Sequence, residues 1–161
     1  ARRQRQMCIR DSIAGVALQG QNTFIEDIDR DSEAYDSVFT CFKMPKATDE
    51  EKAARSAAIQ EATKFAALVP MQVARNAYEL MTVIMDVARL GNRNAVTDAC
   101  VAMMSARSAV LGALMNVRIN LGSLKDKEFA AKLQTEATEL EHLACAKEKE
   151  LLDEINEELK V

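Results

Sequence analysis

The chain has 161 residues and a formal net charge of −4 at pH 7. With 48% apolar residues it is too hydrophobic for a disordered chain, and 5 Gly, 2 Pro and no Trp favour helix over strand. The length suits one domain with a core of several packed helices. No apolar run approaches the ~20 residues of a membrane span, so we expect no membrane association.

Cysteine and histidine are too sparse for a metal centre or a disulfide framework. The chain has one histidine and no CxxC pair, and its four cysteines are widely separated: Cys8, Cys41, Cys100 and Cys145. We therefore expect no metal site, reduced thiols and a cytoplasmic location.

Residues 1–12 differ in character from the rest of the chain. They are rich in Arg, which could indicate nucleic-acid binding or a targeting peptide. The run from Arg2 to Asp11, however, reads as the translation of a common transposase sequencing adapter. We therefore interpret 1–12 as an adapter-derived artefact and 13–161 as the domain. Without this arm the chain is more acidic, which argues against nucleic acid as a partner.

The first expected helix covers 13–43 and is stopped by Pro45. Its apolar residues recur at three- and four-residue steps and predict the inward face: Phe24, Ile25, Ile28, Tyr35, Val38, Phe39 and Phe42. Thr48 and Glu51 form a capping box that opens a second helix, which runs to about Leu68. Pro70 then marks a kink or a new first turn.

A third helix is expected over 71–90, with Gly91 as its C-cap. The fourth, over 95–120, is apolar on most sides, which predicts a place at the centre of the bundle or in a subunit interface. The last helix starts near Asp126, and its expected inward residues are Phe129, Leu133, Leu140, Leu143, Leu151, Ile155 and Leu159. Short connections make neighbours antiparallel, so the prediction is an all-α, up-and-down bundle of about five helices.

Four stretches carry a family resemblance. They are Asp29–Tyr35 (DRDSEAY), Met44–Gln60 (beginning Met-Pro-Lys), Val69–Asp98 (ending GNRNAVTD) and Asn116–Leu121 (NVRINL). In order and spacing they resemble the formiminotransferase-cyclodeaminase C-terminal domain and the methenyltetrahydrofolate cyclohydrolases. The family's N-terminal glycine-rich loop and first helix have no counterpart, so we expect 13–161 to be this domain without them.

The resemblance implies an enzyme of folate one-carbon metabolism. A cyclodeaminase converts 5-formiminotetrahydrofolate to 5,10-methenyltetrahydrofolate with release of ammonia, whereas a cyclohydrolase adds water to the methenyl carbon. The stretch from Pro45 to Gln60 looks more like the cyclodeaminases, which we therefore expect. A cyclohydrolase is one alternative, and a non-catalytic helical interaction module is another that periodicity alone allows.

The resemblance also implies what the protein binds. No metal or redox cofactor is needed beyond the tetrahydrofolate substrate. A homodimer or larger homo-oligomer is implied, with its pocket near the subunit interface, and so is a fused or separate formiminotransferase.

Two carboxylates are candidates for the proton transfers at nitrogen that both reactions need. Asp98 stands at the start of the apolar fourth helix, where a buried charge needs a compensating partner. Complementation of the helix dipole in the first turn explains Asp98 as well. Asp31 lies in the first matched stretch, and a solvated acidic patch is its alternative explanation.

Five polar residues are candidates to bind the folate: Asn92, Asn94, Asn116, Arg118 and Asn120. Turn chemistry explains Asn92 and Asn94 nearly as well. Asn116 and Asn120 share a helix face, whereas Arg118 points elsewhere. An ion pair is the alternative for Arg118, and helix termination is the alternative for Asn120.

Overall fold

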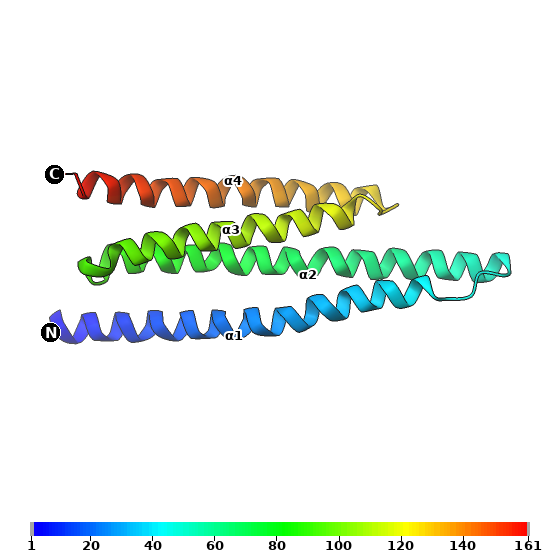
Figure 1. The fold of residues 1–161 in the computed structure, drawn as a ribbon, viewed down its shortest axis with the longest axis horizontal. Helices are drawn as coiled ribbons and strands as arrows, with labels where there is room; N and C mark the ends of the chain where they lie inside the picture. The colour runs from blue at the N-terminus through cyan, green and yellow to red at the C-terminus, as the bar shows by residue number, and fades with distance from the viewer. Residues whose placement is uncertain (1, 161) are drawn as a thin grey trace.

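Residues 2–160 form four long α-helices that run up and down side by side (Figure 1). The computed structural model describes the backbone of 2–160 and the side chains of 13–160. The helices are α1 (Arg2–Phe42), α2 (Asp49–Leu90), α3 (Val96–Leu121) and α4 (Lys127–Glu158), with a 3-10 turn, η1 (Arg93–Ala95), between α2 and α3. The all-α bundle is confirmed. The side chains of 1–12, interpreted as an artefact, lie outside the described part.

The helix ends follow from local capping chemistry. Thr48 Oγ1 accepts from the Glu51 amide at 3.2 Å while Glu51 Oε2 accepts from the Thr48 amide at 3.2 Å, which confirms the capping box. At the other end of α2, the Gly91 amide donates to the Val87 carbonyl at 2.9 Å, and a Cβ on Gly91 would lie 2.3 Å from that oxygen. Asp126 caps α4 by accepting from the Phe129 amide at 3.0 Å. All three boundaries agree with the sequence prediction.

Pro70 does not end a helix, and this accounts for the difference between the expected five helices and the observed four. It lies inside the continuous α2. A proline has no N–H, so the carbonyl of residue 66, four positions earlier, loses its helical donor. Asn120 of α3 replaces that donor, because its Nδ2 donates to the Ala66 oxygen at 2.9 Å. A contact between helices therefore satisfies the carbonyl that Pro70 leaves without a helical donor.

The main core lies between α2, α3 and α4, with α3 in the middle. Its largest fully buried side chains come from all three helices and include Met71, Met81, Met103, Leu114, Leu151 and Ile155. The helix predicted for the centre of the bundle or a subunit interface, α3, lies between α2 and α4, but one of its faces, with Met115 and Ile119, is exposed. In α4 the predicted residues Leu133, Leu140, Leu151 and Ile155 are buried, Phe129 is partly buried, and Leu143 and Leu159 are exposed.

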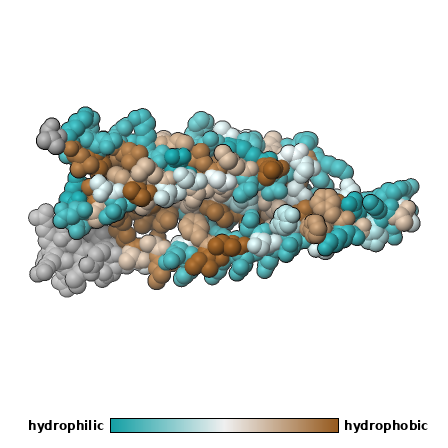
Figure 2. Space-filling view, viewed as in Figure 1, coloured by the Kyte–Doolittle hydropathy of each residue, from teal (hydrophilic) through white to brown (hydrophobic). Residues whose placement is uncertain are grey.

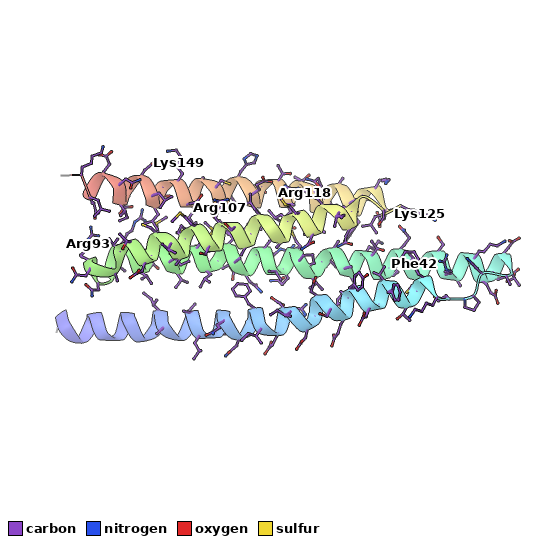
Figure 3. The ribbon with its side chains drawn as sticks, viewed as in Figure 1. Phe42, Arg93, Arg107, Arg118, Lys125 and Lys149 are labelled. Carbon is purple, nitrogen blue, oxygen red and sulfur yellow. The ribbon has the colours of Figure 1, made fainter. Side chains whose placement is uncertain are left out.

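Arg side chains of α2 and α3 tie α4 to this core. The Arg75 guanidinium reaches Glu136 at 2.6 Å, and Arg89 reaches Glu150 at 2.8 Å. Figure 3 shows Arg107 and Arg118 on α3; they pair with Glu148 and Glu141 of α4, the first at 3.0 Å. Ion pairs that remain in contact with solvent stabilise a fold by about 1 kcal/mol or less each, so these pairs set helix register more than overall stability.

The inward face predicted for α1 is largely wrong. Only Phe24 and Val38 of the predicted set are partly buried, whereas Ile25, Ile28, Tyr35, Phe39 and Phe42 are exposed. The contact with α2 is made by a smaller residue, Ala34, against Ala66 and Val69. Periodicity marks the apolar positions of a helix, but it does not say which of them another helix covers. Figure 2 shows the resulting hydrophobic surface along α1.

The stretch Arg93–Leu121 has the length and composition of a membrane span, although the sequence led us to expect none. The core helix of a bundle passes the same test, and α3 packs against both α2 and α4. The finding is therefore weak support for a membrane location.

Candidate functional site

A cavity of about 460 Å³ lies where α1, α2 and α3 meet. Apolar side chains make most of its wall, and polar groups enter from α1 and α3. The lining residues are Phe24, Asp27, Ile28, Asp31 and Ser32 of α1, Pro70 and Val73 of α2, and Ala109, Ala113 and Asn116 of α3. An apolar cavity with a few polar groups is typical of small-molecule sites.

The α1 residues reach the cavity because they share one helix face. Phe24, Asp27, Ile28 and Asp31 follow the three- and four-residue spacing that aligns side chains along a helix. Ser32 turns its hydroxyl back to its own helix, where Oγ donates to the Ile28 carbonyl at 3.0 Å. The carboxylates of Asp27 and Asp31 are therefore the polar groups of this helix face that can interact with a ligand.

Asp27 is the one acidic side chain that is buried in residues 13–160, with 4% of its surface exposed. Arg30 Nη1 donates to its Oδ1 at 2.8 Å, and Asn76 Nδ2 of α2 donates to its Oδ2 at 3.4 Å. The Arg30 side chain remains 46% exposed, so the ion pair links a buried carboxylate to the surface. Partners of this kind offset the hydration that a carboxylate loses when it is buried.

A second cavity, of about 330 Å³, lies along the same seam between α1 and α2. Gln19, Thr23 and Glu79 supply its polar lining, together with Asn76, the partner of Asp27. Phe24 lines both cavities. The Asp27–Asn76 contact therefore lies at the boundary between two hollow regions of the α1–α2 seam.

Two of the predicted site residues lie together in the larger cavity. Asp31 of α1 and Asn116 of α3 both line it, although they are far apart in the sequence. Both side chains are exposed at its open side. The structure thus brings a carboxylate and an amide to one cavity.

The other predicted binding residues make structural contacts in this structure. Asn120 donates to the Ala66 carbonyl, as described above, and also to the Asn116 carbonyl at 3.0 Å. Arg118 pairs with Glu141. Asn92 caps η1 by accepting from the Asn94 amide at 3.1 Å, and both asparagines are exposed. None of these four side chains lines the larger cavity.

The expected burial of Asp98 is wrong, since its side chain is exposed in the first turn of α3. It lies 11 residues before Ala109, the nearest cavity residue on α3, which is about 16 Å along the helix axis. Asp98 instead continues an exposed stripe of α3 that includes Val101, Met115 and Ile119. A helix that is apolar all round buries a polar residue only where a neighbour covers it, and no described helix covers this face.

Sequence reasoning missed Asp27 and Asn76. Neither is among the predicted site residues, although Asp27 is buried beside Asn76. A signal was present, because Asp27 follows Phe24 by three residues and precedes Asp31 by four. An acidic residue inside an otherwise apolar stripe is a candidate for a buried functional group.

Comparison with known proteins gives a consistent family. A family model described as formiminotransferase-cyclodeaminase matches residues 4–139. The methenyltetrahydrofolate cyclohydrolase of Methylorubrum extorquens is 45% identical over 100 residues, which cover 62% of this chain and 48% of that protein. The formimidoyltransferase-cyclodeaminase of Rattus norvegicus is 33% identical over 105 residues, which cover 65% of this chain and 19% of that protein. The matches span about half or less of these relatives.

A solved structure shares the fold. The crystal structure of formiminotetrahydrofolate cyclodeaminase from Thermotoga maritima aligns with a TM-score of 0.67 and 24% sequence identity, over 85% of this chain and 66% of that chain. The helical arrangement described above therefore recurs in a distant sequence.

Proposed function

The chain belongs to the formiminotransferase-cyclodeaminase family, and we propose that its larger cavity binds a tetrahydrofolate whose one-carbon unit reacts between N5 and N10. The observation that carries this proposal is the convergence of Asp31 and Asn116 on one apolar cavity beside the buried Asp27. Apolar walls suit a flat heterocycle, and carboxylate and amide groups suit its hydrogen-bonding edge.

Hydrolysis of the methenyl group is the first candidate reaction. Water adds to the methenyl carbon and loses one proton, which leaves a hydroxyl group on that carbon. The bond from the carbon to N5 then breaks as the hydroxyl gives up its proton to form the formyl C=O and N5 takes up a proton, so that 10-formyltetrahydrofolate and one released proton result. The 45% identity to the Methylorubrum cyclohydrolase favours this reaction. Asp31 would accept the proton of water and return a proton to N5.

The cyclodeaminase reaction is the second candidate, favoured by the motif stretch that follows Pro45. Here N10 attacks the formimino carbon of the group on N5 and loses its proton. The imino nitrogen takes up two protons, one equivalent to the proton lost from N10 and one from an acid, and the carbon–nitrogen bond then breaks to release ammonia and leave the 5,10-methenyltetrahydrofolate cation. The same carboxylate would carry these protons.

Asp98 requires a second chain for a catalytic role. Its stripe on α3 is exposed, with Ile119 at 77% exposure. We propose that the homodimer implied by the family resemblance covers this stripe and that Asp98 acts at the resulting interface. Size-exclusion chromatography with light scattering tests the dimer, and a monomeric, active protein would remove Asp98 from the proposal.

The test of the proposed function is turnover by the Asp31→Asn variant. General acid–base catalysis typically contributes ~10²–10⁴-fold, so we expect kcat to fall by about that factor. Loss of methenyl absorbance measures hydrolysis, and ammonia release from 5-formiminotetrahydrofolate measures cyclodeaminase activity. Asp36→Asn is the matched control, because Asp36 is exposed on α1 and outside the cavity.

Each outcome has a distinct reading. Unchanged turnover in Asp31→Asn refutes the assignment of the proton transfers to this carboxylate. Tetrahydrofolate binding without either reaction in the wild type indicates a non-catalytic binding module. Absence of both binding and turnover refutes the folate proposal for this chain.

A further inference from the structure

We propose that Asp27 recognises the pterin ring, by accepting hydrogen bonds from the 2-amino group and the adjacent N3–H. This inference rests on the proposed function and assigns the two carboxylates of the α1 face to different tasks. Asp27 binds and orients the ring, and Asp31 handles the proton.

Burial and position single out Asp27. The buried polar residues of the described side chains are Asp27 and Thr63. Thr63 is fully explained by its own helix, since its hydroxyl donates to the Ile59 carbonyl at 2.7 Å. Asp27, in contrast, lines a cavity of about 460 Å³. A carboxylate that faces an apolar cavity is costly unless a ligand also uses it.

The Asp27 carboxylate keeps capacity for a ligand. An ionised carboxylate accepts at about four lone-pair sites. One donor reaches each oxygen here, Arg30 at 2.8 Å and Asn76 at 3.4 Å, and the second of these bonds is long. One acceptor site therefore remains on each oxygen. Two adjacent N–H donors on a planar ring match two carboxylate oxygens in a bidentate arrangement.

The walls of the cavity fit a flat ring held at this end. Phe24 lies three residues before Asp27 on the same face of α1, and Val73, Ala109 and Ala113 form apolar surface on α2 and α3. Asp31 is one turn further along α1, about 6 Å along the axis. That separation is comparable with the length of two fused rings, so a pterin anchored at Asp27 extends its N5 side towards Asp31.

The position of Asn116 agrees with this orientation. Its amide offers both a donor and an acceptor at the α3 side of the same cavity. A ring whose amino edge faces Asp27 on α1 presents its remaining polar atoms towards the other helices. Recognition would then come from α1 and α3 together, with α2 as the apolar floor.

The experiment compares two ligands on each variant by isothermal titration calorimetry. The probes are 5-formyltetrahydrofolate and its 2-desamino analogue, which carries hydrogen in place of the amino group. Because a hydrogen bond to a charged group is lost, we expect the wild type to bind the 2-amino compound about 10- to 100-fold more tightly. Asp27→Asn should reduce this preference to about threefold or less, because the amide presents only one acceptor oxygen.

Two further variants test whether the loss of preference is specific to the Asp27 carboxylate. Asp36→Asn should keep the full preference. Asp27→Glu keeps the negative charge but moves the carboxylate by one methylene, so it should lower the preference even if Asp27→Asn fails to fold. The ratio of the two dissociation constants of one variant does not depend on its folded fraction, because a folding equilibrium weakens the apparent binding of both probes by the same factor. Far-UV circular dichroism verifies the helix content.

The outcomes separate this inference from the proposed function. Equal affinity of the wild type for both probes, or full preference retained in Asp27→Asn, overturns the pterin assignment while the folate site stands. Binding of neither probe by the wild type overturns both. Loss of preference in Asp27→Asn together with near-normal affinity for the 2-desamino compound supports the assignment.

Discussion

Compared with the seam between α1 and α2, the α2–α3–α4 side of the bundle is closely packed and tied together by charge. Its core is continuous and contains fully buried Met and Leu side chains, and Arg–Glu pairs link α4 to both neighbours. The α1–α2 seam has a small apolar contact around Ala34, two cavities and an exposed apolar face. Binding volume is thus found where packing is sparse.

This difference assigns stability and function to different parts of the chain. Burial of apolar surface stabilises the three-helix side, whereas polar groups beside empty space cost stability unless a ligand uses them. Asp27, Asp31 and Asn116 all lie on the sparsely packed side. Substitutions should therefore separate into those that change unfolding and those that change binding.

The largest expected effect comes from removing volume in the packed side. Met103 is 0% exposed and Met115 is 66% exposed, although both lie on α3. Met103→Ala should lower the free energy of unfolding by about 2–5 kcal/mol, because it leaves a cavity in the core. Met115→Ala is the matched control and should change the free energy of unfolding of the monomer by less than about 0.5 kcal/mol. Urea unfolding followed by circular dichroism measures both.

A similar loss in both Met variants at concentrations where the protein is a monomer would contradict the comparison. A loss in Met115→Ala that grows with protein concentration would instead show that a second copy of the chain covers the α3 stripe, as the homodimer proposed above requires.

A smaller effect on the free energy of unfolding is expected at Pro70 of α2 and Asn120 of α3. Asn120→Ala leaves the buried Ala66 carbonyl without a donor and should cost about 1–3 kcal/mol. In a Pro70→Ala background, residue 70 regains an N–H that can donate to this carbonyl. The cost of Asn120→Ala should then fall, and a double-mutant cycle from urea unfolding measures the coupling. Additivity within about 0.5 kcal/mol would refute the proposed replacement of the donor.

Sequence reasoning succeeded wherever the determinant is local. The capping groups of Thr48, Gly91 and Asp126 act within a few residues, and the predicted helix ends were confirmed at all three. The apolar stripe of α4 was also largely correct, because its charged face leaves one side for burial. These features depend on backbone chemistry and periodicity alone.

Sequence reasoning failed where a feature depends on residues of another helix. Pro70 does not break α2, and Asn120 of α3 supplies a donor that no local pattern reveals. Asp98 was expected to be buried because its helix is apolar, but burial depends on which helix covers that face. Of the predicted site, Asp31 and Asn116 share the larger cavity, and Asp27 was missed since its partner Asn76 comes from α2.

The smallest expected effect is a pH dependence at the start of α4. The Phe129 amide and then the Lys64 ammonium hold the pKa of Asp126 below its ordinary value, against a smaller desolvation effect. Because the folded pKa is lowered, the stabilisation is present above the unfolded pKa of about 3.9 and is lost as pH falls through the folded value. Asp126→Asn keeps a capping acceptor but does not titrate. Its Tm should therefore fall less than that of the wild type between pH 6 and pH 2.5.

Salt separates the two contributions to this pH dependence. Lys64 Nζ lies 2.9 Å from Asp126 Oδ2 at an exposed position, so high salt should weaken the ion pair between α2 and α4. The capping bond to Phe129 is within one turn and is screened less. In thermal melts at 1 M salt, the difference in pH slope between wild type and Asp126→Asn should shrink but persist. A difference that disappears completely would show that the link to α2, and not the helix cap, ties down the start of α4.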